Sequence, residues 1–196
     1  MIYIVAQYFA IKPQYQISTF SVREIFAGSF LSSDKNSSVN DVTQTLNSIK
    51  EVIPIKIKIP IIGIDANTQL IGAKDNGVME TPTNYYDVGW FKLGPKPGEK
   101  GNAIIIGHLD TKISPNAVFF NLYKLKSGDE IIVENNNNTT AVFRVIESKT
   151  YKYDESPQEV FGQTEKKRLN LITCTGNWLE DKKMYDERLV INAEMI

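Results

Sequence analysis

The chain contains only one cysteine and one histidine among its 196 residues. A single cysteine cannot form an intramolecular disulfide, so the hydrophobic core must hold the fold together in any redox compartment. One histidine and one cysteine also fall short of the ligand set that a zinc site needs. The sequence lacks a glycine-rich phosphate-binding loop and an internal repeat. We therefore expect neither a metal nor a cofactor.

An excess of charge of one sign is also missing. The 22 basic and 23 acidic residues give a net charge of -1, so nothing points to nucleic acid as a partner. No apolar run reaches the roughly 18 residues of a membrane span. Residues 1–11 are nevertheless apolar except for Gln7. This opening is either a core-packing segment or the end of a membrane anchor, and the second interpretation implies membrane association through the N-terminus.

Short β-strands dominate the pattern that is present. Ile55, Ile57 and Ile59 alternate with Lys56 and Lys58, which predicts a strand with one buried face. Further strands are predicted over residues 69–71, 103–106, 130–134, 141–150, 169–173 and 189–193. Seven short strands with few helices indicate an all-β closed barrel or sandwich.

The N-terminal quarter of the chain has a different composition. Residues 32–41 are polar and contain no aromatic side chain, which is typical of a linker. Apolar residues at three-residue spacing after this stretch predict a short helix that ends at Val52. We therefore expect residues 1–52 to form an N-terminal extension and residues 53–196 to form one folded domain, in which any active site would lie.

His108 and Cys174 each stand at the end of a predicted strand, beside a glycine. An imidazole next to a thiol can accept its proton and later return it to a leaving amine, so the two together suit nucleophilic catalysis. On residue type alone the simpler interpretations stay open. A lone cysteine is more often a small buried hydrophobe, and a lone histidine is more often structural.

Arg188 is the third candidate, because it begins a predicted strand one loop after Cys174. A guanidinium there could donate hydrogen bonds to the oxygen that gains charge when a thiolate attacks an amide. The alternative is a surface arginine paired with Asp186 or Glu187.

Together these residues resemble the sortase family. The family's TLxTC signature is similar to the stretch from Asn170 to Cys174, with Asn170 in place of the usual Thr. The family's histidine corresponds to His108 and its arginine to Arg188. Supporting stretches lie at residues 107–111, 117–122 and 125–130, and the resemblance spans residues 54–196. The LITCTG segment that contains Cys174 looks most like class F, with classes D and E close to it.

The resemblance implies an eight-stranded sortase-type β-barrel with short helices. It implies a cysteine transpeptidase that cleaves an LPxTG-like sorting signal of surface proteins between Thr and Gly. The acyl-thioester on Cys174 would then pass to an amine acceptor such as a cell-wall precursor. It also implies an enzyme on the extracytoplasmic face of the membrane of a Gram-positive bacterium.

Secondary roles follow from position in the resembling segments. We expect Thr173, Thr175, Thr111 and Asn170 to contact the substrate. Two other functions stay open at this stage. One is a non-catalytic barrel that binds peptide or carbohydrate with Cys174 buried and inert, and the other is a hydrolytic cysteine peptidase.

Overall fold

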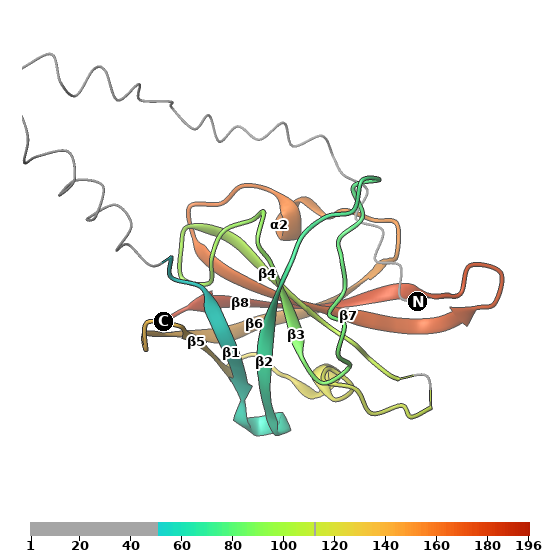
Figure 1. The fold of residues 1–196 in the computed structure, drawn as a ribbon, viewed down its shortest axis with the longest axis horizontal. Coiled ribbons are helices and arrows are strands. Elements are labelled where there is room, and N and C mark those ends of the chain that lie inside the picture. The colour runs from blue at the N-terminus through green and yellow to red at the C-terminus, as the bar shows by residue number, and fades with distance from the viewer. Residues whose placement is uncertain (1–50, 112) are drawn as a thin grey trace, which may run out of the picture. The chain divides into compact units, whose positions relative to one another are not determined.

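The computed structural model describes residues 51–111 and 113–196. Within these residues the chain forms eight strands, which are β1 (Pro54–Ile59), β2 (Ile64–Ile71), β3 (Val88–Phe91), β4 (Gly101–Gly107), β5 (Glu130–Asn135), β6 (Thr140–Lys152), β7 (Lys167–Leu179) and β8 (Met184–Met195) (Figure 1). Three short helical turns join them, η1 (Pro60–Ile62), η2 (Leu122–Lys124) and α2 (Gln158–Phe161). The predicted extension and the helix predicted before Val52 lie outside the described residues.

The strands close into a barrel in the order β1-β2-β3-β4-β7-β8-β6-β5. Two neighbouring pairs, β2 with β3 and β4 with β7, are parallel, and the other pairs are antiparallel. Closure leaves no unpaired sheet edge between β1 and β5. The expected all-β, eight-stranded barrel is confirmed, although β3 was not among the strands predicted from periodicity.

The barrel interior is apolar and takes alternate residues from each strand. Ala103 and Ile105 of β4 and Leu169 and Leu171 of β7 point inward and join one buried cluster with Phe143 of β6. These side chains are almost fully buried, as expected for a strand whose side chains alternate between two faces. The interior therefore holds the fold but presents no reactive group.

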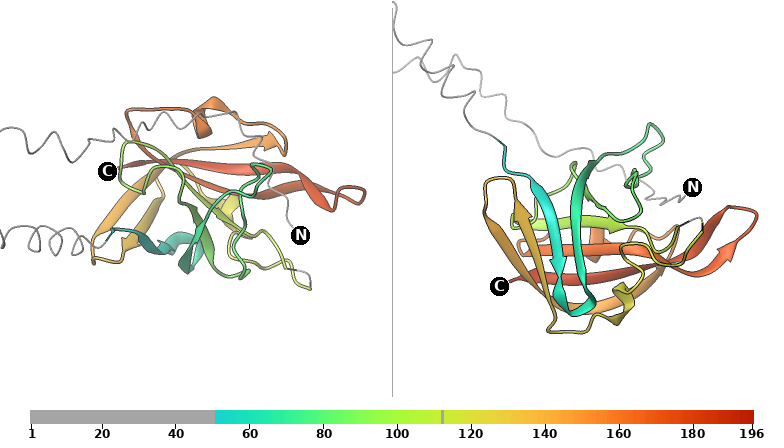
Figure 2. Two further views of the ribbon diagram at one scale, coloured as in Figure 1. Left: turned by 45° about the horizontal axis from the view of Figure 1, so that its top comes forward. Right: turned by 60° about the horizontal axis from the view of Figure 1, so that its bottom comes forward.

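The intervening residues of the same strands form a second layer on the outside of the barrel. Ile104, Ile106, Ile172 and Val190 pack there against Val160 of α2. The segment that carries α2 crosses this outer face, and the β7–β8 hairpin extends beyond the body of the barrel (Figure 2). β4 and residues 169–174 of β7 are thus buried on both sides. None of the helices in residues 51–111 and 113–196 has the length and apolar character needed to cross a membrane.

Candidate active site

His108 and Cys174 occupy matching places at the ends of two parallel strands. β4 and β7 pair with Ile106 opposite Ile172, and His108 and Cys174 each follow two residues later. Parallel strands run in the same direction, so both residues emerge at the same end of the sheet. Side chains two apart share a face, so Cys174 lies on the outer face with Ile172.

Arg188 lies directly opposite Cys174 in the antiparallel pairing of β7 with β8. Its side chain is only 5% exposed. Nη1 of Arg188 donates hydrogen bonds to the carbonyl oxygens of Tyr185 at 2.9 Å and Glu187 at 2.7 Å. Arg188 is therefore a buried, backbone-anchored cation beside the thiol, and not the surface arginine of the alternative interpretation.

His108 is held from three sides. Its Nε2 donates a hydrogen bond to the carbonyl oxygen of Pro82 at 2.8 Å, because a carbonyl can only accept. The Tyr85 ring lies against the imidazole with the ring centroids 4.9 Å apart, and the backbone N–H of Phe119 donates to the His108 carbonyl at 2.9 Å. In the neutral ring Nδ1 is then the acceptor, and this buried atom has no partner among the described residues.

A hydrogen bond between Thr173 and Gly107 links the ends of β7 and β4. The Thr173 hydroxyl, itself buried, donates to the Gly107 carbonyl at 2.9 Å, directly before His108. Gly107 must be glycine, because a Cβ at this position would overlap the buried ring of Phe119. Thr173 is thus placed to hold the histidine-bearing backbone against β7.

Burial keeps both titrating side chains uncharged. Burial raises the pKa of the Cys174 thiol, and Arg188 offsets part of this rise while Asp110 adds to it. Burial lowers the pKa of His108, against the opposite effects of the Pro82 carbonyl and Asp110. At neutral pH the resting pair is therefore mainly thiol and imidazole, and the thiolate with imidazolium is the minor form.

Asn170, expected to contact substrate, is fully buried on the outer face of β7. Its Nδ2 donates to the carbonyl of Val160 at 3.4 Å and to Oδ1 of Asn102 at 3.3 Å, and Nδ2 of Asn102 donates to the carbonyl of Gly162 at 2.7 Å. Both amides thus bond to the segment that carries α2. The structure places Asn170 beneath this segment, where it supports it.

The other two expected substrate contacts differ in exposure and in partners. Thr175 is half-buried on β7, opposite Glu187 and one residue after Cys174. Thr111 lies in the loop that follows His108, where its hydroxyl donates to the carbonyl of Ser114 at 3.0 Å. The Thr111 hydroxyl is therefore engaged within its own turn. Thr175, in contrast, lies on the strand beside Cys174.

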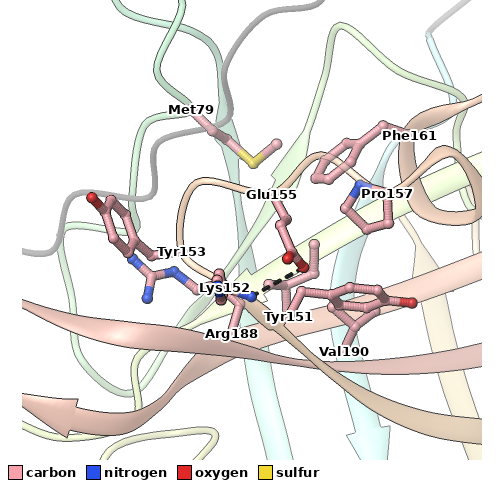
Figure 3. A pocket seen from close by; sticks show the side chains of 10 residues that line it. Met79, Tyr151, Lys152, Tyr153, Glu155, Pro157, Phe161, Arg188 and Val190 are labelled. Carbon is pink, nitrogen blue, oxygen red and sulfur yellow. Dashed lines mark hydrogen bonds between the residues drawn. The ribbon is translucent and has the colours of Figure 1, made fainter.

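A pocket opens beside Arg188 on the outer face (Figure 3). It is lined by Met79, Tyr151, Lys152, Tyr153, Glu155, Pro157, Phe161, Ile172, Arg188 and Val190. The lining is mainly apolar and aromatic, and Phe161 and Pro157 come from the α2 segment that Asn102 and Asn170 support. Lys152 and Glu155 add a polar wall, where the backbone N–H of Lys152 donates to Oε2 of Glu155 at 3.2 Å. Such a pocket suits an apolar side chain of an extended ligand.

Sequence reasoning missed four groups around these residues, namely Pro82, Tyr85, Asp110 and Tyr185. Asp110 could have been noticed as an acid two residues after the histidine. Pro82 and Tyr85 come from a distant segment and carry no local signal. Tyr185 precedes Arg188 by only three residues, but its contact with Asp110 spans 75 residues and has no local signal. Among the described residues, no group of three or more His, Cys, Asp or Glu side chains could hold a metal ion.

Comparison with known proteins gives one family. The model of the sortase domain matches residues 57–196. A search of curated proteins gave no match.

Three solved structures that share this fold are sortases. A Clostridium perfringens sortase D5 transpeptidase is 25% identical, with a TM-score of 0.54, and the match covers 82% of this chain and 90% of that one. Sortase A from Corynebacterium diphtheriae is 23% identical with a TM-score of 0.59, covering 85% and 72%. A sortase C-1 variant from S. pneumoniae is 19% identical with a TM-score of 0.55. The match covers 72% of this chain but only 65% of that one.

Proposed function

The chain belongs to the sortase family, and from this premise we propose that it is a cysteine transpeptidase that cleaves an LPxTG-like sorting signal between Thr and Gly. The observation that carries the proposal is the strand register. It aligns His108 at the end of β4, Cys174 on β7 and Arg188 on β8 at one end of the same sheet. A nucleophile, an acid/base and a cation are the parts that acyl transfer needs.

In the proposed first half-reaction, the Cys174 thiolate attacks the carbonyl carbon of the Thr residue. An S–C bond forms, and the oxygen that becomes negative accepts hydrogen bonds from the Arg188 guanidinium. The C–N bond to Gly then breaks, and the imidazolium of His108 gives its proton to the departing amine. The product is an acyl-thioester on Cys174, with His108 left neutral.

The second half-reaction reverses the proton movement. An acceptor amine, such as that of a cell-wall precursor, attacks the thioester and loses a proton to His108 as the thiolate leaves. Nδ1 of His108 is the atom we assign to both transfers, because the Pro82 carbonyl occupies Nε2–H. Since the chain has only one histidine, nitrogen-15 NMR of the imidazole reports this tautomer without overlap from another residue.

Substrate selection follows from the pocket beside Arg188. An apolar residue of the sorting signal, upstream of the cleaved bond, would fill the space between Ile172, Val190 and Phe161. Thr175 would contact the peptide near the thiol. On the LITCTG segment we propose class F, with classes D and E as the near alternatives. We further propose that the chain acts on surface proteins at the extracytoplasmic face of a Gram-positive membrane.

The decisive experiment uses a fluorogenic LPxTG-type peptide library, with and without an added glycine amine, followed by mass spectrometry. The unmodified chain should cleave between Thr and Gly and yield an amine-linked product, and Cys174→Ala should yield none. Arg188→Ala should lower kcat by roughly 100-fold. Arg144→Ala is the matched control, because Arg144 is an exposed arginine paired with Glu130 on the neighbouring strand.

Three outcomes would contradict parts of this proposal. Cleavage that an added amine neither captures nor accelerates would identify a hydrolytic peptidase instead. Cleavage that survives Cys174→Ala would remove the thiol from the mechanism. If no peptide is cleaved and the thiol is alkylated only after unfolding, the chain is a binding barrel with an inert cysteine.

A further inference from the structure

Resting on the proposed function, we propose that Asp110 and Tyr185 form a positioning pair. The pair fastens the loop that carries His108 to the hairpin that carries Cys174 and Arg188, and it places a carboxylate charge at the reacting groups. Neither residue has a role in the reaction scheme above. Both lie at the point where the two halves of the site meet.

Tyr185 connects the two halves through two different atoms. Its hydroxyl donates a hydrogen bond to Oδ2 of Asp110, which lies two residues after His108 and 75 residues away from Tyr185 in sequence. Its backbone carbonyl accepts the 2.9 Å hydrogen bond from Nη1 of Arg188. A displacement of Tyr185 would therefore move the histidine loop and the guanidinium together.

The tyrosine ring is itself fixed. Trp178, across the hairpin on β7, contacts it edge to face with the ring centroids 5.3 Å apart and the planes at 74°. Tyr185 opposes Trp178 in the register of β7 with β8, next to an irregularity that begins at Thr175. The hydroxyl therefore projects from a supported position, and the hydrogen bond to Asp110 can transmit that position to the histidine loop.

The carboxylate of Asp110 acts on three neighbours. It opposes the fall that burial causes in the pKa of His108 and adds to the rise that burial causes in the pKa of Cys174, against Arg188. Burial and the hydrogen bond to Asp110 raise the pKa of Tyr185 to about 12, so its hydroxyl remains a donor across the working pH range. Asp110 thus favours imidazolium and disfavours thiolate, a smaller influence on both groups than burial.

Two near-isosteric substitutions separate the geometric part of this role from the electrostatic part. Asp110→Asn removes the negative charge and keeps an acceptor oxygen for the Tyr185 hydroxyl. Tyr185→Phe removes the hydroxyl and keeps the charge and the ring against Trp178. The readouts are kcat and KM for the cleaved peptide, and the pH dependence of iodoacetamide alkylation of Cys174. Only one thiol is present, so mass spectrometry assigns the adduct directly.

We expect Tyr185→Phe to lower kcat by roughly 10- to 100-fold with KM nearly unchanged, because a misplaced acid/base slows the reaction without weakening binding. Asp110→Asn should move the midpoint of the alkylation profile to lower pH, because a negative neighbour of the thiol is gone. Tyr123→Phe, an exposed tyrosine on η2, is the control and should leave both readouts unchanged.

The proposal is overturned if Tyr185→Phe retains the wild-type kcat, or if Asp110→Asn leaves the alkylation midpoint in place. A role in folding alone would lower the melting temperature of the variants without moving that midpoint. Failure of the proposed function is recognised separately, because the wild-type chain would then cleave no peptide. The alkylation profile still tests the charge of Asp110 in that case.

Discussion

The two faces of β7 pack in different environments. Leu169 and Leu171 face the barrel interior, where the neighbours are apolar, whereas Asn170 and Ile172 face the outer layer beneath α2. The interior packs residues from all around the barrel, so it contributes most of the apolar burial. The outer layer contains buried amides and leads at its end to Cys174. In this fold, stability and chemistry are thus separated by which side of one strand a residue faces.

The outer layer also depends on polar contacts in a way that the interior does not. α2 is only four residues long, which is too short to be stable without tertiary support. Its segment is held by the hydrogen bonds from Asn102 and Asn170 and by the burial of Val160. Pro157 and Phe161, which line the pocket beside Arg188, therefore depend on these contacts for their positions.

The largest expected effect is the loss of stability on truncating Leu171 or Ile172, two neighbouring residues on opposite faces of β7. Leu171→Ala should reduce the free energy of unfolding by about 2–5 kcal/mol, because it leaves a cavity in the closed interior. The loss of unfolding free energy for Ile172→Ala should lie at the lower end of that range. This variant should also raise KM, because Ile172 lines the pocket. Urea unfolding followed by tryptophan fluorescence, with peptide kinetics on the folded variants, tests the pair. Equal losses of stability with an unchanged KM would remove the distinction between the two faces.

A smaller effect should follow from loosening the α2 segment. Asn102→Ala leaves the half-buried carbonyl of Gly162 without its donor, which should cost about 0.5–1.5 kcal/mol and raise KM. Asn192→Ala is the matched control. Asn192 lies opposite Asn170 on the same face, but its buried Nδ2 has no hydrogen-bond partner within the described part of the chain. If the two variants behave alike, the hydrogen bond from Asn102 does not position the pocket.

The smallest expected effect concerns protonation at the end of the outer layer. Burial raises the pKa of Cys174, so its alkylation rate in the folded chain should rise about tenfold per pH unit over roughly pH 6 to 9 without levelling off. In urea the midpoint should fall to the ordinary thiol value. The free energy of unfolding should likewise fall as the pH rises from that ordinary value towards the raised one, because the unfolded chain releases its proton first. A plateau below neutral pH would show a stable thiolate and contradict the burial argument.

The sequence was most informative where alternation is regular. The isoleucines of β1 alternate with lysines, and the strand was predicted almost to its ends. β2 was shortened in the prediction because Asp65 and Asn67, two turn-forming residue types, fill exposed positions between the buried Ile64 and Ala66. β3 was missed because it has four residues, and Gly89 among them is dictated by the crowding of Ile71 and Pro82.

The candidate site could be predicted only in part. Cys174, His108 and Arg188 were chosen as candidates because each terminates or begins a strand-like run, and the register places all three at one end of a sheet. The burial of Asn170 under the α2 segment was not predicted, because parity alone gives the face of a strand and does not say whether a helix covers that face. The pairing of Asp110 with Tyr185 depends on closure of the barrel, which no local pattern records.

The parallel pairing of β4 with β7 also bears on how the enzyme folds. Cys174 and Arg188 belong to strands that follow each other along the chain, so one short loop closure unites them. His108 joins them only when two strands separated by β5 and β6 come together, and such non-local contacts form slowly. If His108 has the proposed acid/base role, recovery of peptide cleavage after denaturation should therefore lag behind recovery of hairpin structure, since His108 is positioned by the slowest class of contact.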